Sequence, residues 1–261
     1  MIVGIVGRTV DGHNHMCSLG TGKDTVADAL AESHNFTKVA LADPMKRFCM
    51  EVYNFSWDQL WGPSSSRNAV DERYPREKHD YQGGKCACCG AFYYEERGWN
   101  VDQCYLTPRY ALQQLGTEWG RNCFNDTWVR YGMKVADKLL RAFHYPKTHD
   151  WYSYVPAVGI IEGNMAYCYD VPRPDEVQGV VFSDVRFENE VEYIKKEGGK
   201  VLLVYRKVDE LPAGVNIDHQ SEYDLNKYGP DDGIWDGVLY NDASVEDLGE
   251  KTGQALEALR G

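Results

Sequence analysis

The residues Gly20-Thr21-Gly22-Lys23 have the types and spacing of a loop that binds phosphate. Glycines let backbone N–H groups turn inward around an anion, and the amino end of a helix adds partial positive charge. A lysine at position 23 could reach the β- and γ-phosphates of a nucleotide. The apolar stretch 1–6 predicts a buried strand, and residues 26–35 predict a helix, so the loop has the context that it requires. We expect it to bind ATP; the alternative is a plain turn that enters a helix.

The loop departs from the usual pattern at two positions. Cys17 stands where the first glycine is expected, five positions before Gly22. If Gly7 takes that role, the polar stretch Arg8–Leu19 contains an insertion. Asp24 replaces the usual Ser or Thr after the lysine, and Thr25 follows it.

A second candidate set follows the apolar stretch Gly179–Ser183, which predicts another strand. Asp184 would lie at the carboxyl end of that strand, where ligands gather in open α/β sheets, and could hold Mg²⁺. Arg186 could stabilise charge on a transferring phosphoryl group. The alternative is an aspartate at a helix start and a surface arginine.

The remaining elements alternate between strands and helices, which favours a parallel sheet covered by helices. We predict strands at 36–41, 200–205 and 237–240, and helices at 45–53, 110–119, 127–143, 188–197 and 245–259. The stretch Gly62–Thr107 differs in composition and has little aliphatic periodicity. It reads as an insertion, such as a lid, with too few apolar residues to fold unaided.

Four of the cysteines lie in that insertion. Cys86 and Cys89 form a C-x-x-C followed by glycine, the form of a zinc knuckle. Cys104, His79 or Cys88 could complete a tetrahedral site that staples the insertion. Reduced surface thiols are the alternative. Three further cysteines in apolar or aromatic surroundings are expected to be core residues: Cys49, Cys123 and Cys168.

Composition and charge limit the class of protein. The chain has 261 residues, 28 Lys and Arg against 40 Asp and Glu, and a net charge of −12. That balance argues against stable nucleic-acid binding, because a broad phosphate-binding face would be basic. No apolar run reaches the length of a membrane span, and no secretory leader is visible, so we expect a cytoplasmic enzyme without membrane contact.

Taken in order, several fragments resemble the bacteriophage deoxynucleoside monophosphate kinases. They are spread from Gly20 to Asp242 and skip mainly Arg8–Leu19, Gly62–Thr107 and His144–Pro174. The matching fragments are Gly20–Asp28, Leu41–Lys46, Arg109–Glu118, Trp128-Val129, Asp184–Glu190, Gly198–Val201, His219–Glu222 and Asn241-Asp242.

The resemblance implies a three-layer α/β fold like that of the P-loop nucleoside monophosphate kinases, formed by a single domain over residues 1–261 with a lid at 62–107. It implies transfer of the ATP γ-phosphoryl group to a deoxynucleoside monophosphate (dNMP), with Mg²⁺, in the host cytoplasm, by a protein that could be a homodimer. Catalysis would rest on Lys23, Asp184, Arg186 and Arg109. ATP would be bound by Gly7, Gly20, Thr21, Gly22, Lys23, Asp24, Thr25 and, packing on the adenine, Arg206. The monophosphate would be bound by Asp43, Lys46, Arg109, Gln113, Thr117 and Arg121.

Three other functions compete with this one. The chain could be a P-loop kinase for another phosphorylated acceptor, such as dephospho-coenzyme A or phosphomevalonate. It could be a module that binds ATP without transferring phosphate. A zinc-stapled nucleic-acid binder is the third, and the net charge of −12 disfavours it.

Overall fold

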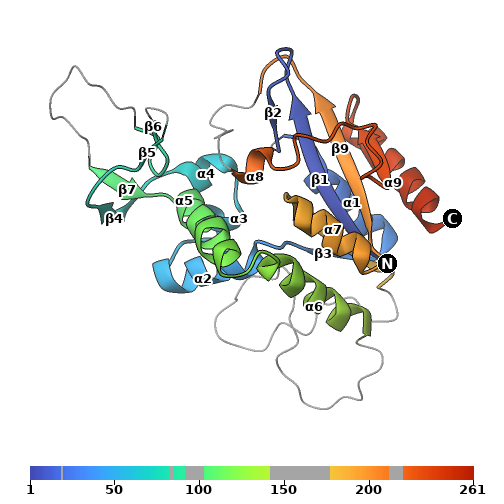
Figure 1. Cartoon of the computed structure of the whole chain (residues 1–261), viewed down its shortest axis with the longest axis horizontal. Coiled ribbons are helices and arrows are strands. Elements are labelled where there is room, and N and C mark those ends of the chain that lie inside the picture. The colour runs from blue at the N-terminus through green and yellow to red at the C-terminus, as the bar shows by residue number, and fades with distance from the viewer. Residues whose placement is uncertain (19, 83–84, 92–102, 142–176, 212–219) are drawn as a thin grey trace. The chain divides into compact units, whose positions relative to one another are not determined.

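The apolar strand at the amino terminus lies in the centre of a sheet. The structure, a computed structural model, describes residues 1–18, 20–82, 85–91, 103–141, 177–211 and 220–261. Within these residues a six-stranded sheet forms around β1 (Ile2–Val10), in the order β10–β9–β1–β8–β3 with β2 paired to β1 (Figure 1). All of these pairs are parallel except β1–β2. The other strands are β2 (Met16–Cys17), β3 (Phe36–Val39), β8 (Gly179–Val185), β9 (Lys200–Lys207) and β10 (Gly237–Tyr240).

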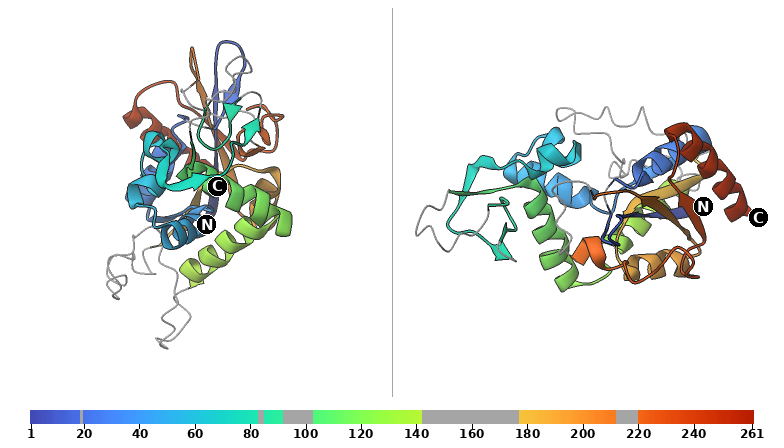
Figure 2. Two further views of the ribbon diagram at one scale, coloured as in Figure 1. Left: turned by 90° about the vertical axis from the view of Figure 1, so that its left-hand side faces the viewer. Right: turned by 90° about the horizontal axis from the view of Figure 1, so that it is seen from above.

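Helices cover both faces of the sheet. Helices α1 (Lys23–His34) and α9 (Val245–Arg260) pack on one face, where Val3 and Ile5 of β1 share a core with residues of both helices. Helices α6 (Thr127–Arg141) and α7 (Glu188–Lys196) pack on the other face. The right-hand view of Figure 2 shows α1 and α9 on the side of the strands opposite to α7. This mostly parallel sheet between helices confirms the expected α/β fold of the P-loop kinase kind.

Strand β1 continues past the point where the sequence predicted its end. It pairs with β8 as far as Val6, and then Thr9 and Val10 pair with β2. The first two polar residues of the stretch Arg8–Leu19 are buried. Arg8 keeps only 3% of its surface exposed, because its guanidinium donates hydrogen bonds to the carbonyl oxygens of Leu225 and Tyr228, and Thr9 is fully buried. The stretch therefore begins as strand and returns as a hairpin.

The chain divides into two compact units. The first unit comprises residues 1–41 and 126–261 and contains the sheet, and the second comprises residues 42–125. The second unit includes the whole predicted insertion and the helices on either side of it. Its elements are α2 (Asp43–Tyr53), α3 (Trp57–Trp61), α4 (Ser64–Asn68), β4 (Asp71–Arg76), β5 (Tyr81–Gln82), β6 (Lys85–Cys86), β7 (Cys104–Leu106), α5 (Pro108–Gln113) and the π-helix η1 (Gln114–Arg121).

The second unit has an apolar core of its own. Phe55 and Leu60, at 1% and 0% exposure, pack with Cys49 of α2 and Ala111 of α5. The predicted insertion therefore obtains its core from the flanking helices. The expectation for Cys49 is confirmed, whereas that for Cys123 is wrong, because its side chain is exposed just after η1. Cys168 lies outside the described residues.

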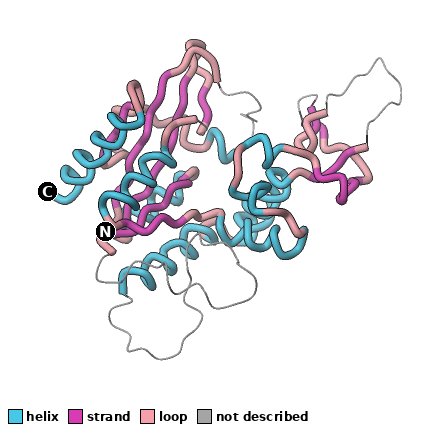
Figure 3. Tube along the Cα trace, turned by 180° about the vertical axis from the view of Figure 1, so that it is seen from behind, coloured by secondary structure: helices cyan, strands magenta, loops and turns pink. Residues whose placement is uncertain are grey.

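Secondary structure along the chain follows the predicted alternation, as the strands and helices of Figure 3 show. The predicted helix 110–119 is instead one turn and a half of α-helix followed by η1. The short helix α8 (Gln220–Tyr223) had no sequence signal. The predicted helix 127–143 is described as far as Arg141. None of the described helices is both long enough and apolar enough to span a bilayer.

Candidate active site

The backbone of the phosphate loop has the conformation that its glycines permit. Gly20 and Gly22 have φ angles of +66° and +88°, in the left-handed region that favours glycine. Gly22 is the N-cap of α1, and its carbonyl oxygen accepts the first helical hydrogen bond, from Val26 N at 3.0 Å. The backbone N–H of Lys23 is bonded to the Thr21 hydroxyl at 3.1 Å. The loop therefore leads directly into α1, as the phosphate-binding interpretation requires, but the β1–β2 hairpin separates it from the end of β1 in the sequence.

Gly7 lies directly against this loop. A Cβ atom built on Gly7 would lie 2.4 Å from the Thr21 Oγ1 atom, closer than two such atoms can approach. Thr21 itself is 1% exposed. The role that the sequence suggested for Gly7 therefore has a steric basis: only a glycine in β1 leaves room for Thr21.

Three side chains from the carboxyl-terminal half of the first unit hold the loop in place. An Arg206 guanidinium nitrogen donates to the Gly20 carbonyl oxygen at 2.8 Å, and Asn241 Nδ2 donates to the Thr21 carbonyl oxygen at 2.9 Å. Arg186 donates to the Ser18 hydroxyl at 3.0 Å. The sequence assigned no role to Asn241 or Ser18. A clue to Asn241 in the sequence was its position directly after β10, because ligands bind at the carboxyl ends of parallel strands.

Lys23 begins α1 and is largely covered. Its side chain is 13% exposed, and its ammonium group contacts the Asp24 carboxylate at 2.9 Å. Asp24 is 63% exposed and also lies 3.7 Å from the Lys38 ammonium group. The departure from the usual motif therefore gives Lys23 a carboxylate neighbour. Thr25 follows in the first turn of α1.

Asp184 joins the carboxyl ends of two strands. It belongs to β8, and its Oδ1 atom accepts a hydrogen bond from the backbone N–H of Leu41, just after β3, at 2.7 Å. Glu190, 3% exposed, accepts from the backbone N–H groups of Arg186 and Phe187 at 2.8 and 3.1 Å. Glu190 therefore fixes the turn that carries Arg186, a role that sequence reasoning missed.

The residues predicted for the monophosphate all lie in the second unit. Asp43 is 3% exposed and accepts a hydrogen bond from the Trp61 indole at 3.2 Å, while Lys46 places its ammonium group 5.3 Å from the centre of the same ring. Gly116 of η1 approaches Met45 of α2 so closely that a Cβ there would lie 2.9 Å from its sulfur. The contacts with Trp61 join α2 and α3, and that of Gly116 with Met45 joins α2 and η1. Asp43 and Lys46 belong to α2, Thr117 and Arg121 to η1, and Arg109 and Gln113 to α5.

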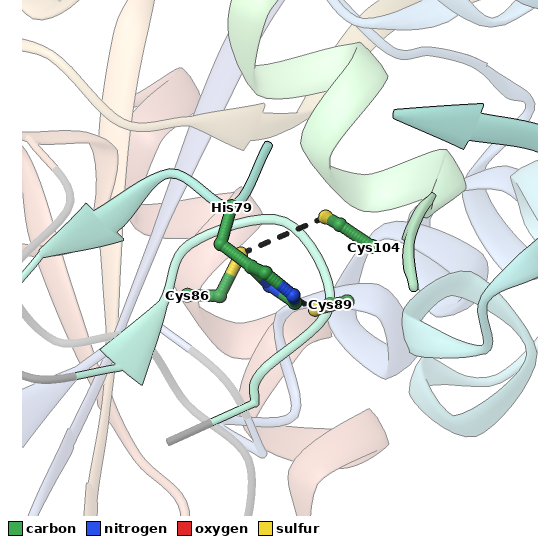
Figure 4. Close-up of side chains that lie close together, drawn as sticks. All are labelled: His79, Cys86, Cys89 and Cys104. Atoms are coloured by element: carbon green, nitrogen blue, oxygen red, sulfur yellow. Dashed lines mark hydrogen bonds between the residues drawn. The ribbon is translucent and has the colours of Figure 1, made fainter. Parts of the chain in front are cut away.

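A separate cluster in the second unit consists of His79, Cys86, Cys89 and Cys104 (Figure 4). Burial disfavours the Cys86 thiolate, but hydrogen bonds from the Cys89 N–H and from His79 outweigh it and lower the pKa of Cys86 to about 6. Burial and the neighbouring cysteines raise the pKa of Cys104 well above its ordinary value. All four are among the five residues that the sequence offered as metal ligands; the fifth, Cys88, does not belong to the cluster.

Comparison with known proteins gives one line of support for the nucleotide interpretation. No family model matches the chain. The chain is similar to a protein of Acanthamoeba polyphaga mimivirus named "Putative deoxynucleotide monophosphate kinase", with 25% identity over 229 residues. That alignment covers 88% of this chain and 87% of the viral protein, so it includes both units. The name of that relative describes a phosphotransferase that acts on nucleotides.

Proposed function

We propose that the protein is an ATP-dependent deoxynucleoside monophosphate kinase, which transfers the γ-phosphoryl group of ATP to a dNMP and releases the diphosphate and ADP. The observation that carries the proposal is the loop Gly20–Lys23, whose two left-handed glycines open α1 at the carboxyl end of the central strand. The similarity to the mimiviral protein supports the choice of a dNMP as the acceptor.

The positive charge at the loop suits a nucleoside triphosphate. The backbone N–H groups at the start of α1 and the Lys23 ammonium group supply positive charge to the β- and γ-phosphates. The Arg186 guanidinium is held near the loop by Ser18 and adds a second cation. Because phosphoryl transfer depends mainly on positioning and charge neutralisation, these groups can account for catalysis without a covalent intermediate.

The donor set also fits Mg²⁺. Asp184 offers carboxylate oxygens near the carboxyl end of β8, and Asp24 and Thr25 offer further oxygens in the first turn of α1. Oxygen ligands, with one or two carboxylates beside substrate phosphates, are what Mg²⁺ prefers. Bound with ATP, Mg²⁺ would neutralise phosphate charge.

For the acceptor, the proposal follows the family resemblance. Arg109, Lys46 and Arg121 would neutralise the monophosphate, and Asp43, Gln113 and Thr117 would complete its site. The segment 62–107 would act as a lid that excludes water and so suppresses ATP hydrolysis. We further propose that the enzyme acts in the cytoplasm of an infected host, as a homodimer. A bacteriophage source stays a prediction, since the relative described above belongs to a virus of amoebae.

The test is ADP release from ATP·Mg²⁺ in the presence of each dNMP in turn, including dUMP and a 5-substituted pyrimidine nucleotide. We expect at least one monophosphate to stimulate ADP release strongly, and Lys23→Ala to abolish this. Lys38→Ala is the matched control, because Lys38 contacts Asp24 and Asp28 from outside the loop. Arg109→Ala should raise KM for the monophosphate and leave KM for ATP unchanged.

Two outcomes would contradict the proposal. ATP binding without turnover in the presence of any monophosphate would favour a non-catalytic module. Stimulation by dephospho-coenzyme A or phosphomevalonate, and by no nucleotide, would favour the other class of P-loop kinase.

A further inference from the structure

The Cys/His cluster of the second unit lies outside the proposed kinase machinery. His79 comes from the loop after β4, Cys86 from β6, Cys89 from the turn after β6, and Cys104 from the start of β7. Figure 4 shows the four side chains directed toward a common centre. Their ligand atoms all lie within 4.8 Å of one another. Segments separated in the sequence thus bring four metal-binding groups to one place.

The distances fit a tetrahedral metal. Zinc–sulfur bonds of about 2.3 Å at the tetrahedral angle separate two sulfur ligands by about 3.8 Å. The Sγ atoms of Cys86 and Cys104 are 3.9 Å apart, and the Cys89 Sγ lies 3.3 Å from the His79 Nδ1. A disulfide needs about 2.05 Å between its sulfurs, so the Cys86–Cys104 pair is arranged for a shared ion rather than for a covalent bond.

The knuckle backbone is already folded in the form that such an ion needs. Gly90 has a φ of +77°, which lets the chain reverse after Cys89. The Gly90 N–H donates to the Cys86 carbonyl oxygen at 2.9 Å, and the Cys86 N–H donates to the Ala91 carbonyl oxygen at 2.7 Å. These bonds close the turn, so that Cys86 and Cys89 are placed on the same side.

The local core, as far as it is described, consists largely of small side chains. Among the residues that the structure describes, the buried ones in this part of the unit are Cys86, Cys88, Cys104 and Tyr110, and they pack mainly with small side chains. Thiols and methyl groups bury little apolar area, so their burial stabilises the fold only weakly. A metal ion with ligands from the loop after β4, from β6 and its turn, and from β7 would add stability to this part of the unit.

We propose that His79, Cys86, Cys89 and Cys104 bind one structural Zn²⁺. Three thiolates and an imidazole are a ligand set typical of structural zinc, and four protein ligands leave no open position for a substrate. The softness of thiolate ligands selects zinc over Mg²⁺ or Ca²⁺. The site is thus closed, and it belongs to folding rather than to catalysis.

Hydrogen bonds connect the zinc knuckle to the start of α5. The Thr107 hydroxyl donates to the Cys88 carbonyl oxygen at 2.9 Å and accepts from the Tyr110 N–H, as the N-cap of α5. The Tyr110 hydroxyl donates to Asp80, next to the ligand His79, at 2.9 Å. Zinc therefore fixes the first turn of the helix that carries Arg109.

Cys88 provides an internal control, because it lies between two ligands in the sequence but not in the cluster. Its thiol donates to the Tyr105 carbonyl oxygen at 3.2 Å. The untagged full chain, purified under reducing conditions with zinc in the medium, should contain one zinc per chain by elemental analysis. Cys86→Ser and Cys104→Ser should lose most of it, whereas Cys88→Ser and Cys123→Ser should retain it. A chelator should lower the Tm of the wild-type chain by several degrees.

A ligand variant that fails to fold would lose metal for an indirect reason, so cobalt exchange in the wild-type chain provides a second measurement. Co²⁺ should give the intense visible bands of a tetrahedral ion with thiolate charge transfer. A zinc content far below one per chain after reconstitution, weak octahedral cobalt bands, or equal metal loss in Cys88→Ser and Cys104→Ser would each overturn the proposal. None of these measurements uses ATP or a dNMP, so their outcome is independent of the kinase assignment.

Discussion

Asn241 holds the backbone of Thr21. Its amide donates to the Thr21 carbonyl oxygen at 2.9 Å, and it lies against Gly22, where a Cβ atom would come within 2.5 Å of its nitrogen. The residue that follows the edge strand β10 therefore sets the position of a loop that begins some two hundred residues earlier. Such a tether fixes the loop before a ligand arrives, which lowers the entropy lost on binding.

The Asn241→Ala variant should bind ATP more weakly. Loss of one neutral hydrogen bond is worth ~1 kcal/mol, so KM for ATP should rise about fivefold, with little change for the acceptor. The neighbouring Asp242→Asn is the control, because Asp242 is 69% exposed and pairs with Lys251. Equal KM values for ATP in Asn241→Ala and wild type would show that the tether is not needed for binding.

Gly7→Ala should damage the loop by overpacking. The new methyl group would collide with Thr21, which is buried and has no room to move. We expect a loss of about 1–3 kcal/mol in the free energy of unfolding, together with weaker ATP binding. At Gly12, in the hairpin, the nearest atom to an added Cβ is 3.8 Å away. Gly12→Ala should therefore behave like wild type in thermal unfolding and in ATP titration, and a Gly7→Ala variant that did so too would contradict the packing argument.

The Asp184→Asn variant removes the carboxylate charge and keeps a hydrogen-bond acceptor at the same position. The asparagine oxygen can still accept the Leu41 N–H, so the Tm should stay close to that of wild type. Loss of the carboxylate charge should lower kcat for phosphoryl transfer about 100-fold or more. Asp28→Asn, an exposed change in α1, is the control. Full activity of Asp184→Asn over a range of Mg²⁺ concentrations would remove Asp184 from the proposed site.

The pair Asp71–Arg73 should make stability depend on pH in the acid range. Hydrogen bonds from Arg73 and Gln59 hold the pKa of Asp71 well below its ordinary 3.8. Because the folded pKa is depressed, the stabilisation is complete above the unfolded pKa and is lost as the pH falls toward the folded pKa. Arg73 is 48% exposed, so solvent screening limits the effect to the order of 1 kcal/mol.

The measurement is denaturant unfolding of wild type and Asp71→Asn between neutral pH and about pH 3. Wild type should be the more stable at neutral pH, and the difference should shrink on acidification. Glu72→Gln, a substitution at the exposed neighbouring residue, is the control. A difference between wild type and Asp71→Asn that stays constant over the range would refute the role of this ion pair.

Local patterns were enough to predict most of the sheet. The apolar stretch at the amino terminus and the turn residues around Lys23 specify a strand, a loop and a helix without help from distant residues. The end of β1 could not be predicted in this way. Arg8 looks like a loop residue, and it is buried only because the carbonyl groups of Leu225 and Tyr228 accept its hydrogen bonds.

The two candidate sites also differ in how much of each could be predicted from local sequence patterns. The spacing of Cys86 and Cys89 was enough to predict the knuckle. Of the three remaining candidates, His79 and Cys104 lie in the cluster and Cys88 does not. The contact of Asn241 with Thr21 could not be read from the sequence, because the two residues are 220 positions apart and only the fold brings them together. The role of Glu190 was missed although it is local, since Glu190 accepts from the backbone N–H groups of Arg186 and Phe187 at the start of α7. The apolar residues near Cys123 in the sequence predicted a core position for it. That prediction is wrong, because the Cys123 side chain is exposed just after η1.

The route of the chain also sets an order of assembly during synthesis. The second unit is one continuous stretch, residues 42–125, whereas the first unit is interrupted by it. The parallel partners of β1 begin only at Gly179 and Lys200, and the tethers of the loop are Arg206 and Asn241. During synthesis on a ribosome, the second unit can therefore fold before the strands that pair in parallel with β1 have been made. The phosphate loop is therefore made before the residues that tether it, and it gains its full set of contacts only after Asn241 has been added.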